Sequence, residues 1–262
     1  MYNEVVSTTA VVTGAGRGLG RAIAVRLAAR GHHVFATDVD ADAATTTAAL
    51  VDGSPLRLDV RDPDAHRRVA RIAGERGRLA VWVNNAGVLA VGDTWTLADA
   101  DARRLVEINL LGTIWGCHAA VPAMAEGGHI INIASLSALV PTPGLAIYGA
   151  SKWGVAGFSL SLAGELRASG SRVRVSSLNP GAIAGDMTSN VANHAASAIL
   201  FGSTLLAIDD VADAAVALLD EPTLERTIPA ATGAVMHALR PFPGLGLRIL
   251  ERVARIGRRR QR

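Results

Sequence analysis

Short runs of apolar residues alternate with longer amphipathic stretches along most of the chain. The apolar runs predict strands at 10–13, 33–37, 56–60, 79–83, 128–134 and 173–178. Between them apolar residues recur at helical spacing, as Leu19, Ile23 and Leu27 do, which predicts intervening helices. Because strands and helices alternate without a linker or a repeat, the pattern predicts a single α/β domain. We expect a doubly wound parallel sheet flanked by helices on both faces.

Local residues set several helix boundaries. Asp62 followed by Pro63 is typical of a helix N-cap with proline at the first helical position, and it predicts helix 63–76. The run 96–99 resembles a capping box for a long helix that ends near residue 125. Further helices are predicted at 147–167 and 209–220, and a weak strand at 232–236.

Two stretches depart from this alternation. Between 184 and 207 the periodicity fails, which predicts a mobile lid or substrate loop; its apolar residues are Ile199, Leu200, Phe201, Leu205 and Leu206. The segment 241–262 mixes apolar residues with arginines, so we separate it as a basic amphipathic tail from a catalytic domain at 1–240. The tail has three open interpretations: a helix on an anionic membrane surface, a helix docked on a neighbouring subunit, or a solvated end.

Composition narrows the class of protein. Of 262 residues, half are hydrophobic and 19% are charged, so a sizeable core can form. A net charge of +3 with 4% aromatic residues argues against nucleic-acid binding. The single cysteine, Cys117, is expected in a buried helix, and the scattered histidines predict no metal site. With no signal peptide and no apolar run of about 18 residues, we expect a cytoplasmic protein, with membrane association through the tail as the alternative.

A glycine cluster follows the first strand directly and opens the first helix. Its candidate phosphate-binding residues are Gly14, Arg17, Gly18, Leu19 and Gly20. Glycine lets the backbone approach a pyrophosphate, and free amides at the start of a helix point toward it. Tight turns also use glycine, but the strand–glycine–helix order favours a dinucleotide site.

Asp38 ends the second strand, 18 residues beyond Gly20. An acidic residue near this spacing accepts hydrogen bonds from an adenosine ribose, and its charge repels a 2′-phosphate. Asp38 therefore favours NAD over NADP, whereas Arg17 could meet a 2′-phosphate and favours the reverse. The alternative role of Asp38 is a helix N-cap.

Tyr148 and Lys152 form the most distinctive pair in the chain. Lys152 is the only lysine, and the only other tyrosine is Tyr2. Residues four apart share one helical face, so an ammonium can favour the ionised form of the phenol. Ser135 lies at the carboxyl end of a predicted strand, where catalytic groups of parallel sheets gather. Asn109, among apolar neighbours in a helix, is a candidate for a polar relay.

Together these motifs resemble the short-chain dehydrogenase/reductase family. The matching residues occur in the family's order and spacing: Thr13–Gly20, Asp59, Asn84–Gly87, Asn109, Ser135, Tyr148–Lys152 and Asn179–Gly181. Two features depart from the family's pattern. Gly185 stands where the family often has a threonine, with Thr188 following late, and the arginine-rich tail replaces the family's usual C-terminal strand.

The resemblance implies a Rossmann-type domain that transfers a hydride between a nicotinamide cofactor and a secondary alcohol or ketone. It implies Tyr148 as general acid/base, Ser135 as substrate stabiliser, Lys152 as charge and ribose contact, and Asn109 as relay. Besides the glycine loop and Asp38, the implied cofactor contacts are Asp59, Val60, Asn85, Ala86, Gly87, Tyr148, Lys152, Pro180, Gly181 and Ile183.

We expect NAD as the cofactor and an apolar, steroid- or lipid-like substrate, because the residues of the predicted lid are apolar. The resemblance also implies a homodimer or homotetramer. Two alternatives remain: an NADPH-dependent carbonyl reductase that uses Arg17, and a non-catalytic dinucleotide-binding regulator.

Overall fold

A computed structural model describes residues 8–261; Tyr2 and the last residue of the tail lie outside the described residues. Seven parallel strands form one sheet in the order β3-β2-β1-β4-β5-β6-β7. The strands are β1 (Thr8–Thr13), β2 (His33–Asp38), β3 (Ser54–Arg57), β4 (Arg78–Asn84), β5 (Gly128–Ile133), β6 (Val173–Pro180) and β7 (Glu225–Ile228). The predicted doubly wound α/β fold is confirmed.

Helices connect the strands and extend the chain beyond the sheet. The α-helices are α1 (Gly18–Ala29), α2 (Ala41–Leu50), α3 (Pro63–Arg76), α4 (Asp99–Val106), α5 (Gly112–Ala123), α6 (Ala146–Ala168), α7 (Asp186–Ser189), α8 (Ile208–Ala217), α9 (Ala230–Leu239) and α10 (Pro243–Arg260). Short 3-10 turns are η1 (Thr94–Thr96), η3 (Leu136–Ala138) and η4 (Ala195–Phe201), and η2 (Glu107–Leu111) is a π-helical turn between α4 and α5.

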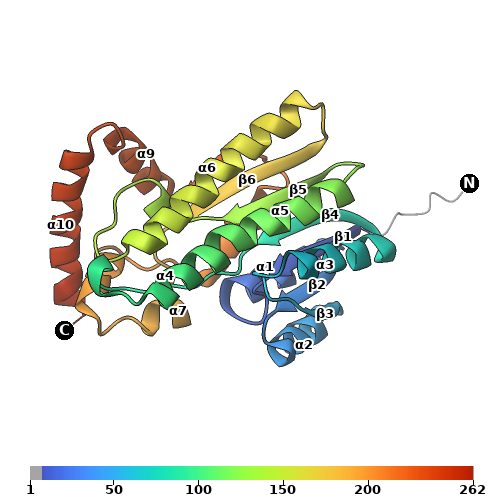
Figure 1. The fold of residues 1–262 in the computed structure, drawn as a ribbon, viewed down its shortest axis with the longest axis horizontal. Coiled ribbons are helices and arrows are strands. Elements are labelled where there is room, and N and C mark those ends of the chain that lie inside the picture. The colour runs from blue at the N-terminus through green and yellow to red at the C-terminus, as the bar shows by residue number, and fades with distance from the viewer. Residues whose placement is uncertain (1–7, 262) are drawn as a thin grey trace, which may run out of the picture.

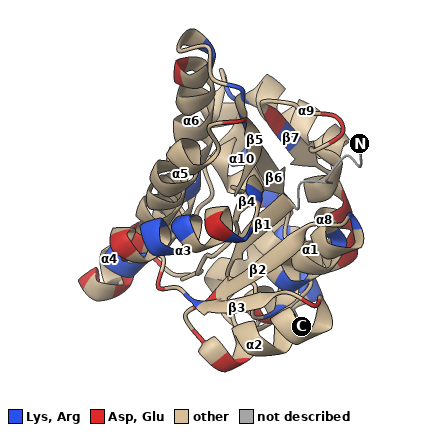
Figure 2. Ribbon diagram, turned by 90° about the vertical axis from the view of Figure 1, so that its right-hand side faces the viewer, with Lys and Arg blue, Asp and Glu red and all other residues tan. Residues whose placement is uncertain are grey.

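The sheet separates two hydrophobic cores. In β1, Ala10 and Val12 face the core beneath α1, α2 and α8, whereas Val11 faces the core beneath α3, α5 and α6. Alternate side chains of a strand point to opposite faces, so a strand covered on both sides must be apolar throughout. Figure 1 shows α4, α5 and α6 along one face of the sheet, and Figure 2 shows charged residues mainly on the covering helices and connecting segments.

The third strand differs from the prediction of 56–60. It ends at Arg57, and Leu58 continues only through a backbone hydrogen bond to the Asp38 carbonyl. Asp59 then turns the chain, because its carbonyl accepts from the Asp62 amide. Leu58 and Val60 are apolar although they lie outside the strand, because both are buried in the core under α3. The N-cap at Asp62 and helix 63–76 are confirmed.

The predicted capping box at 96–99 is wrong. Thr96 lies inside η1, where its hydroxyl donates to the Asp93 carbonyl. The N-cap of α4 is Ala98, which supplies no side-chain hydrogen bond. The threonine hydroxyl is therefore occupied one turn before the helix begins.

The weak strand predicted at 232–236 is also wrong. These residues belong to α9, and the edge strand β7 lies earlier, where 225–228 pair in register with 177–180 of β6. The segment after Pro229 is rich in alanine, which favours helix. Pairing with β6 is thus already complete when the chain reaches α9.

The tail forms α10, which packs against η4 of its own chain (Figure 1). The Gln261 side chain donates to the Ala192 carbonyl at 2.7 Å and to Ser197 Oγ at 2.9 Å. The interpretation of 241–261 as a solvated end is therefore wrong. No helix within 8–261 is long and apolar enough to cross a membrane.

Candidate active site

The sheet order places a crevice between β1 and β4. The chain leaves β1 toward β2 on one side and continues from β4 to β5 on the other, so the loops after β1 and β4 diverge there. Ligands of open parallel sheets bind at this topological switch point, beyond the carboxyl ends of the strands. A cavity of about 950 Å³ occupies this position in the structure.

The glycine loop forms one wall of the cavity. Gly14 has φ +61°, and a Cβ there would lie 2.8 Å from the Cα of Ala86 in the loop after β4. A Cβ at Gly20 would collide with the carbonyl oxygen of Gly14. The close packing of this turn, of helix α1 and of the loop after β4 therefore requires glycine at both positions.

The start of α1 suits an anion. Arg17, its N-cap residue, makes no side-chain capping bond, and no acidic residue lies in the first turn. The first amides of a helix lack intrahelical acceptors and carry the positive end of the helix dipole. Gly18, Leu19 and Gly20 all line the cavity here. These amides fit a pyrophosphate.

Asp38 lies at the end of β2, facing the same cavity. Its carboxylate accepts from the backbone amide of Gly16 at 2.9 Å and from that of Asp40 at 3.1 Å. The N-cap of α2 is Asp40, whose side chain accepts from the amides of Asp42 and Ala43. The alternative interpretation of Asp38 as that N-cap is therefore wrong.

Two ion pairs flank this half of the cavity. Arg17 pairs with Asp186 of α7 at 3.4 Å, with both side chains largely exposed. Asp59 pairs with Arg61 at 2.6 Å, and this hydrogen-bonded guanidinium lowers the pKa of the Asp59 carboxyl. Arg17 thus connects the glycine loop to the segment after β6, while Asp59 keeps a partly exposed carboxylate at the cavity edge.

The two asparagines after β4 have separate roles. The Asn85 side chain donates to the carbonyls of Thr13 at 2.9 Å and Gly14 at 3.1 Å, so it ties the β4 loop to the glycine loop. The buried Asn84 accepts from the indole of Trp82 and donates to Asn132, both at 2.8 Å. The prediction that an asparagine bonds across to the first loop is confirmed for Asn85.

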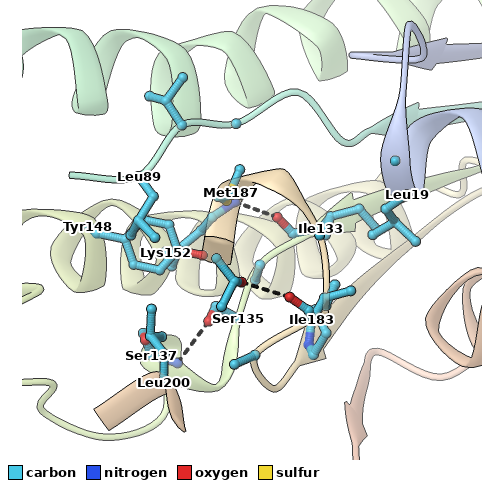
Figure 3. Close-up of a pocket in the computed structure, with 18 of the residues that line it drawn as sticks. Leu19, Leu89, Ile133, Ser135, Ser137, Tyr148, Lys152, Ile183, Met187 and Leu200 are labelled. Atoms are coloured by element: carbon cyan, nitrogen blue, oxygen red, sulfur yellow. Dashed lines mark hydrogen bonds between the residues drawn. The ribbon is translucent and has the colours of Figure 1, made fainter. Parts of the chain in front are cut away.

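Ser135, Tyr148 and Lys152 converge at the carboxyl edge of the sheet (Figure 3). Ser135 follows β5, and its hydroxyl accepts from the Ser137 amide at 3.1 Å. Tyr148 and Lys152 come from the first two turns of α6, with the ammonium 5.9 Å from the centre of the phenol ring. Lys152 Nζ donates to the Ile133 carbonyl at 2.8 Å, which fixes the ammonium beneath the cavity.

Burial changes the proton affinities of this pair. It lowers the pKa of the Lys152 ammonium to about 8, because the charged form loses its hydration. Burial also raises the pKa of the Tyr148 phenol, and the neighbouring Ser135 hydroxyl opposes that rise. The sequence predicted a lowered tyrosine pKa. In the described site desolvation dominates, and Tyr148 is a neutral phenol at neutral pH.

Asn109 lies beside this group without lining the cavity. It occupies the π-helical turn η2 and is fully buried. Its side chain accepts from the Val88 amide at 2.8 Å and donates to the Val88 carbonyl at 3.0 Å and to Ser151 Oγ at 3.2 Å. Ser151 in turn donates to the Tyr148 carbonyl. Asn109 thus joins the loop after β4 to α6.

Every other predicted site residue lines the one cavity. These residues are Gly14, Arg17, Gly18, Leu19, Gly20, Asp38, Asp59, Val60, Asn85, Ala86, Gly87, Ser135, Tyr148, Lys152, Pro180, Gly181 and Ile183. They come from loops that the chain separates by up to 169 residues (183 minus 14). The parallel sheet brings them to one edge.

Several lining residues were not predicted from the sequence. Thr188, which follows late after Gly185, is buried, lines the cavity and donates to the Ile183 carbonyl at 2.7 Å. Of the predicted lid residues, Ile199 and Leu200 line the cavity, whereas Leu206 packs against a core of the sheet. Lining residues that were not predicted at all include Leu89, Val140, Met187, Thr232, Met236, Leu250 and Val253. Of these, Leu250 and Val253 lie in α10, whose apolar spacing indicated a helix but not its contact with the cavity.

Cys117 is excluded as a nucleophile at this site. It is buried in α5, and burial raises the pKa of its thiol to about 12. The reactive form of cysteine is the thiolate, which is suppressed here. The sequence-based expectation of a buried helical cysteine is confirmed.

Comparisons with known proteins agree with this geometry. A family model described as short chain dehydrogenase matches residues 8–196. The chain is 37% identical over 205 residues to trans-4-hydroxycyclohexanecarboxylate dehydrogenase of Sinomonas cyclohexanicum, covering 72% of this chain and 77% of the relative. It is 38% identical over 184 residues to the 3-oxoacyl-[acyl-carrier-protein] reductase FabG of Escherichia coli, covering 68% and 75%.

A solved structure extends the likeness to the fold. A short-chain dehydrogenase/reductase from Burkholderia phymatum, crystallised in complex with NAD, superposes with a TM-score of 0.80 at 28% identity, covering 90% of this chain and 93% of that one. Sequence, fold and site geometry therefore agree. This chain belongs to the short-chain dehydrogenase/reductase family of oxidoreductases.

Proposed function

We propose that this protein interconverts a secondary alcohol and a ketone with NAD as the hydride carrier. One observation carries the proposal: Ser135, Tyr148 and Lys152 open into the same cavity as the glycine loop. A reacting carbon between them and the cofactor would have a proton donor or acceptor on one side and a hydride carrier on the other.

The fit of NAD rests on three features of the cavity. The uncapped start of α1 offers amides to the pyrophosphate, and the Asp38 carboxylate at the end of β2 suits a ribose diol. Asp59 and Val60 line the part of the cavity assigned to adenine, while Pro180, Gly181 and Ile183 line the part assigned to nicotinamide. The neighbour from Burkholderia phymatum, itself an NAD complex, supports the same cofactor.

The chain's own residues handle the proton. A bound nicotinamide would supply or accept the hydride. In ketone reduction, Tyr148 donates its phenolic proton to the substrate oxygen as that oxygen gains charge, and Ser135 donates a hydrogen bond to the same atom. The Lys152 ammonium stabilises the resulting phenolate. In alcohol oxidation the proton moves in reverse: Tyr148 first loses its phenolic proton to solvent through the relay that Asn109 supports, and the phenolate then accepts the proton of the substrate hydroxyl.

The substrate end of the cavity favours an uncharged, apolar molecule. The lining residues from Met187 onward along the chain include no charged side chain: Met187, Thr188, Asn190, Val191, Ile199, Leu200, Gly202, Ser203, Ile208, Thr232, Met236, Leu250 and Val253. A carboxylate placed among these residues would lose hydration, and the arginines that line the cavity, Arg17, Arg61 and Arg104, come from earlier segments of the chain. We therefore keep the proposal that the substrate is apolar and steroid- or lipid-like in size and polarity.

A matched pair of substrates tests this proposal. We expect oxidation of 4-methylcyclohexanol with NAD at a kcat/KM at least about tenfold above that of trans-4-hydroxycyclohexanecarboxylate, since an unpaired buried charge is costly. Initial rates of NADH formation at 340 nm measure both. A preference for the carboxylate would contradict the proposed substrate class.

Tyr148→Phe tests the chemistry itself. The variant keeps the ring and loses the titrating oxygen, so turnover should fall by at least about 10²-fold while NAD affinity, measured by fluorescence titration, changes little. Leu160→Ala, at an exposed position of the same helix, is the matched control. Near-normal activity of Tyr148→Phe would overturn the assignment, and failure to bind either dinucleotide would refute the enzyme reading.

The two alternatives are separated by the same binding titration. Tighter NADP than NAD binding would favour a reductase that uses Arg17. Binding of NAD without turnover of any alcohol or ketone would favour the non-catalytic regulator.

We also propose a contact for the outward face of α10. Arg248, Arg252, Arg255 and Arg259 form an exposed stripe at spacings of four, three and four, and none of them has an ion pair with a described residue. Such a stripe suits an anionic membrane surface. Co-sedimentation with vesicles containing phosphatidylglycerol, but not with phosphatidylcholine alone, is the expected result.

Light scattering tests the proposed dimer or tetramer.

A further inference from the structure

Helix α10 is fixed onto the segment that follows β6 by direct backbone contact. A Cβ at Gly257 would collide with the carbonyl of Ala198 in η4, and a Cβ at Gly202 would lie 2.6 Å from the carbonyl oxygen of Val253. A side chain at either glycine would therefore push the helix and η4 apart. Gln261 adds two hydrogen bonds at the end of α10.

The inward face of α10 reaches the cavity. Gly246, Leu250, Val253 and Gly257 recur at spacings of four, three and four, so they form one stripe. Leu250 is 5% exposed, and both Leu250 and Val253 line the cavity. Gly257, at one end of the stripe, lets the helix approach η4 closely, whereas a Cβ at Gly246 would meet no atom within 4 Å. The two larger residues between them line the cavity.

This wall lies at the substrate half of the cavity. Ile199 and Leu200 of η4 and the following Gly202 line the same cavity as Ser135 and Ser137, and Figure 3 labels Leu200 together with both serines. From the opposite side Gly144 packs against η4, since a Cβ there would lie 2.6 Å from the Ala196 carbonyl. The segment around η4 is thus held between the loop before α6 and α10.

The wall also lies beyond the part of the chain that matches the family. That match ends at residue 196, at the beginning of η4. The glycine loop and the catalytic group fall inside it, whereas Leu250 and Val253 fall outside. Any selectivity that α10 confers therefore depends on contacts made by residues outside the matched segment.

We propose that α10 is the specificity element of this enzyme, and that Leu250 and Val253 contact the part of the substrate remote from the reacting carbon. This inference rests on the proposed alcohol–ketone activity and deepens it. The wall is apolar and is held in place by backbone contacts, so it limits the length of an uncharged aliphatic or alicyclic substrate. We therefore expect α10 to determine which substrate sizes bind, whereas Ser135 and Tyr148 contact the substrate hydroxyl group.

Size-changing variants test the proposal. Leu250→Phe and Val253→Phe extend side chains into the cavity, and Leu250→Ala and Val253→Ala enlarge it. The kcat/KM values of 2-alkanols from 2-butanol to 2-decanol are measured with NAD. One methylene changes pocket selectivity by roughly tenfold or more. The phenylalanine variants should lower kcat/KM for the longest alcohols by about that factor and leave 2-butanol within about twofold, and the alanine variants should shift the optimum to longer chains.

Ile256→Ala and Arg258→Ala are the controls, because both residues are exposed on the same helix. Thermal unfolding and NAD titration establish that each variant is folded. A folded, NAD-binding phenylalanine variant with the size profile of the wild type would overturn the inference. Absence of turnover with every alcohol in the wild type would instead refute the proposed function.

A second variant covers the case in which the phenylalanine variants do not fold. Val253→Cys adds a thiol at the wall, while the native Cys117 is buried with a raised pKa and serves as an unreactive background. Disulfide exchange with benzyl methanethiosulfonate should reduce kcat/KM for 2-decanol by about tenfold, spare 2-butanol, and be slowed by 2-decanol. Equal loss for both alcohols, or labelling without any loss, would overturn the proposal.

Discussion

Lys152 is the residue whose charge the site controls most closely. Its ammonium is buried, holds the Ile133 carbonyl and lies beneath the Tyr148 ring. Arginine supplies the side-chain positive charge elsewhere in the chain, but its planar guanidinium presents five donors, whereas Lys152 Nζ has one acceptor among the described residues, the Ile133 carbonyl. A compact ammonium matches this single acceptor better than a guanidinium does.

The charge of Lys152 predicts a pH dependence. Burial lowers the pKa of Lys152 to about 8 and raises that of Tyr148, so as pH rises Lys152 loses its proton first. In ketone reduction the phenol must donate its proton and the ammonium must stabilise the product phenolate. We therefore expect kcat/KM for reduction to be constant below about pH 7 and to fall as pH rises through about 8.

Two variants test whether the fall in kcat/KM above pH 7 comes from deprotonation of Lys152. Lys152→Met should be less active by on the order of 10²-fold, with no transition near pH 8. Lys152→Arg should also show no transition, because a guanidinium stays charged in this range. Rate profiles between pH 6 and 9.5 measure this. A transition near pH 8 that survives in Lys152→Arg would assign the titration to another group.

Asp38 predicts the choice of dinucleotide. Its carboxylate is held toward the cavity by two backbone amides, where a 2′-phosphate would meet like charge. Asp38→Ser should therefore improve NADP binding relative to NAD by at least about tenfold, because like charges in contact cost several kcal/mol. Fluorescence titration gives both dissociation constants.

Asp40→Ser is the matched control, since serine also caps a helix and Asp40 caps α2. It should leave the ratio of NADP to NAD affinity unchanged. Adding Arg17→Ala to Asp38→Ser should remove part of the gained NADP affinity. An unchanged ratio in Asp38→Ser would place the ribose elsewhere.

At the scale of elements, the turn η2 positions the loop after β4. The sequence predicted one long helix containing a buried asparagine. The structure instead inserts a π-helical turn at 107–111, and Asn109 lies inside it. π turns that interrupt helices are frequent at functional sites. From there Asn109 binds both backbone groups of Val88, next to the cofactor cavity.

Asn109→Ala should therefore weaken the fold as well as the site. The Val88 amide and carbonyl lose their partner, which costs about 1–3 kcal/mol of unfolding free energy. Urea denaturation measures the change, and Thr96→Ala, which removes an exposed hydrogen bond in η1, should cost less than about 0.5 kcal/mol. If Asn109 acts only through a relayed proton, its variant would lose kcat at unchanged stability.

The sequence predicted elements well where hydrophobic periodicity and capping residues agree. Helix 63–76 is an example, because Asp62, Pro63 and the apolar stripe all indicate the same boundaries. Prediction from the sequence failed where tertiary contacts determine the structure of a segment. Leu58 and Val60 are apolar because they enter a core after the strand has ended, and α9 replaces a predicted strand because β6 is already paired.

The residues of the candidate site also fall into a group that the sequence predicted and a group that it did not. Residues on strand ends and the glycine loop were predictable, because a parallel sheet must bring those ends together. Leu250 and Val253 were not, since nothing in the local sequence indicates that α10 returns to the cavity. That return depends on Gly202 and Gly257, whose missing side chains permit the contact. A close backbone approach leaves no hydrophobic pattern.

At the scale of the whole molecule, two buried histidines link stability to pH. His129, in β5, bonds Ser176 of β6 at 2.8 Å; burial, reinforced by the charge of Arg174, lowers its pKa to about 4. His66, in α3, donates through Nε2 to the Val60 carbonyl at 3.0 Å, while its Nδ1 has no partner within the described residues. Burial lowers the pKa of His66 as well. Because a carbonyl can only accept, His66 is protonated on Nε2 and packs in the core as a neutral ring.

These histidines predict acid sensitivity. In the unfolded chain they bind protons near pH 6.5, whereas folded His129 does so only near pH 4. Between these values the unfolded state holds more protons than folded His129 does, so stability falls as pH falls from 6.5 toward 4, by up to about 1.4 kcal/mol per pH unit for His129. The lowered pKa of His66 acts in the same direction. Urea denaturation of His129→Gln should give a shallower slope than the wild type, whereas the exposed His118→Gln should keep the wild-type slope. Equal slopes for His129→Gln and the wild type would mean that acid weakens the fold through other groups, and that the contact between β5 and β6 tolerates a charged imidazole.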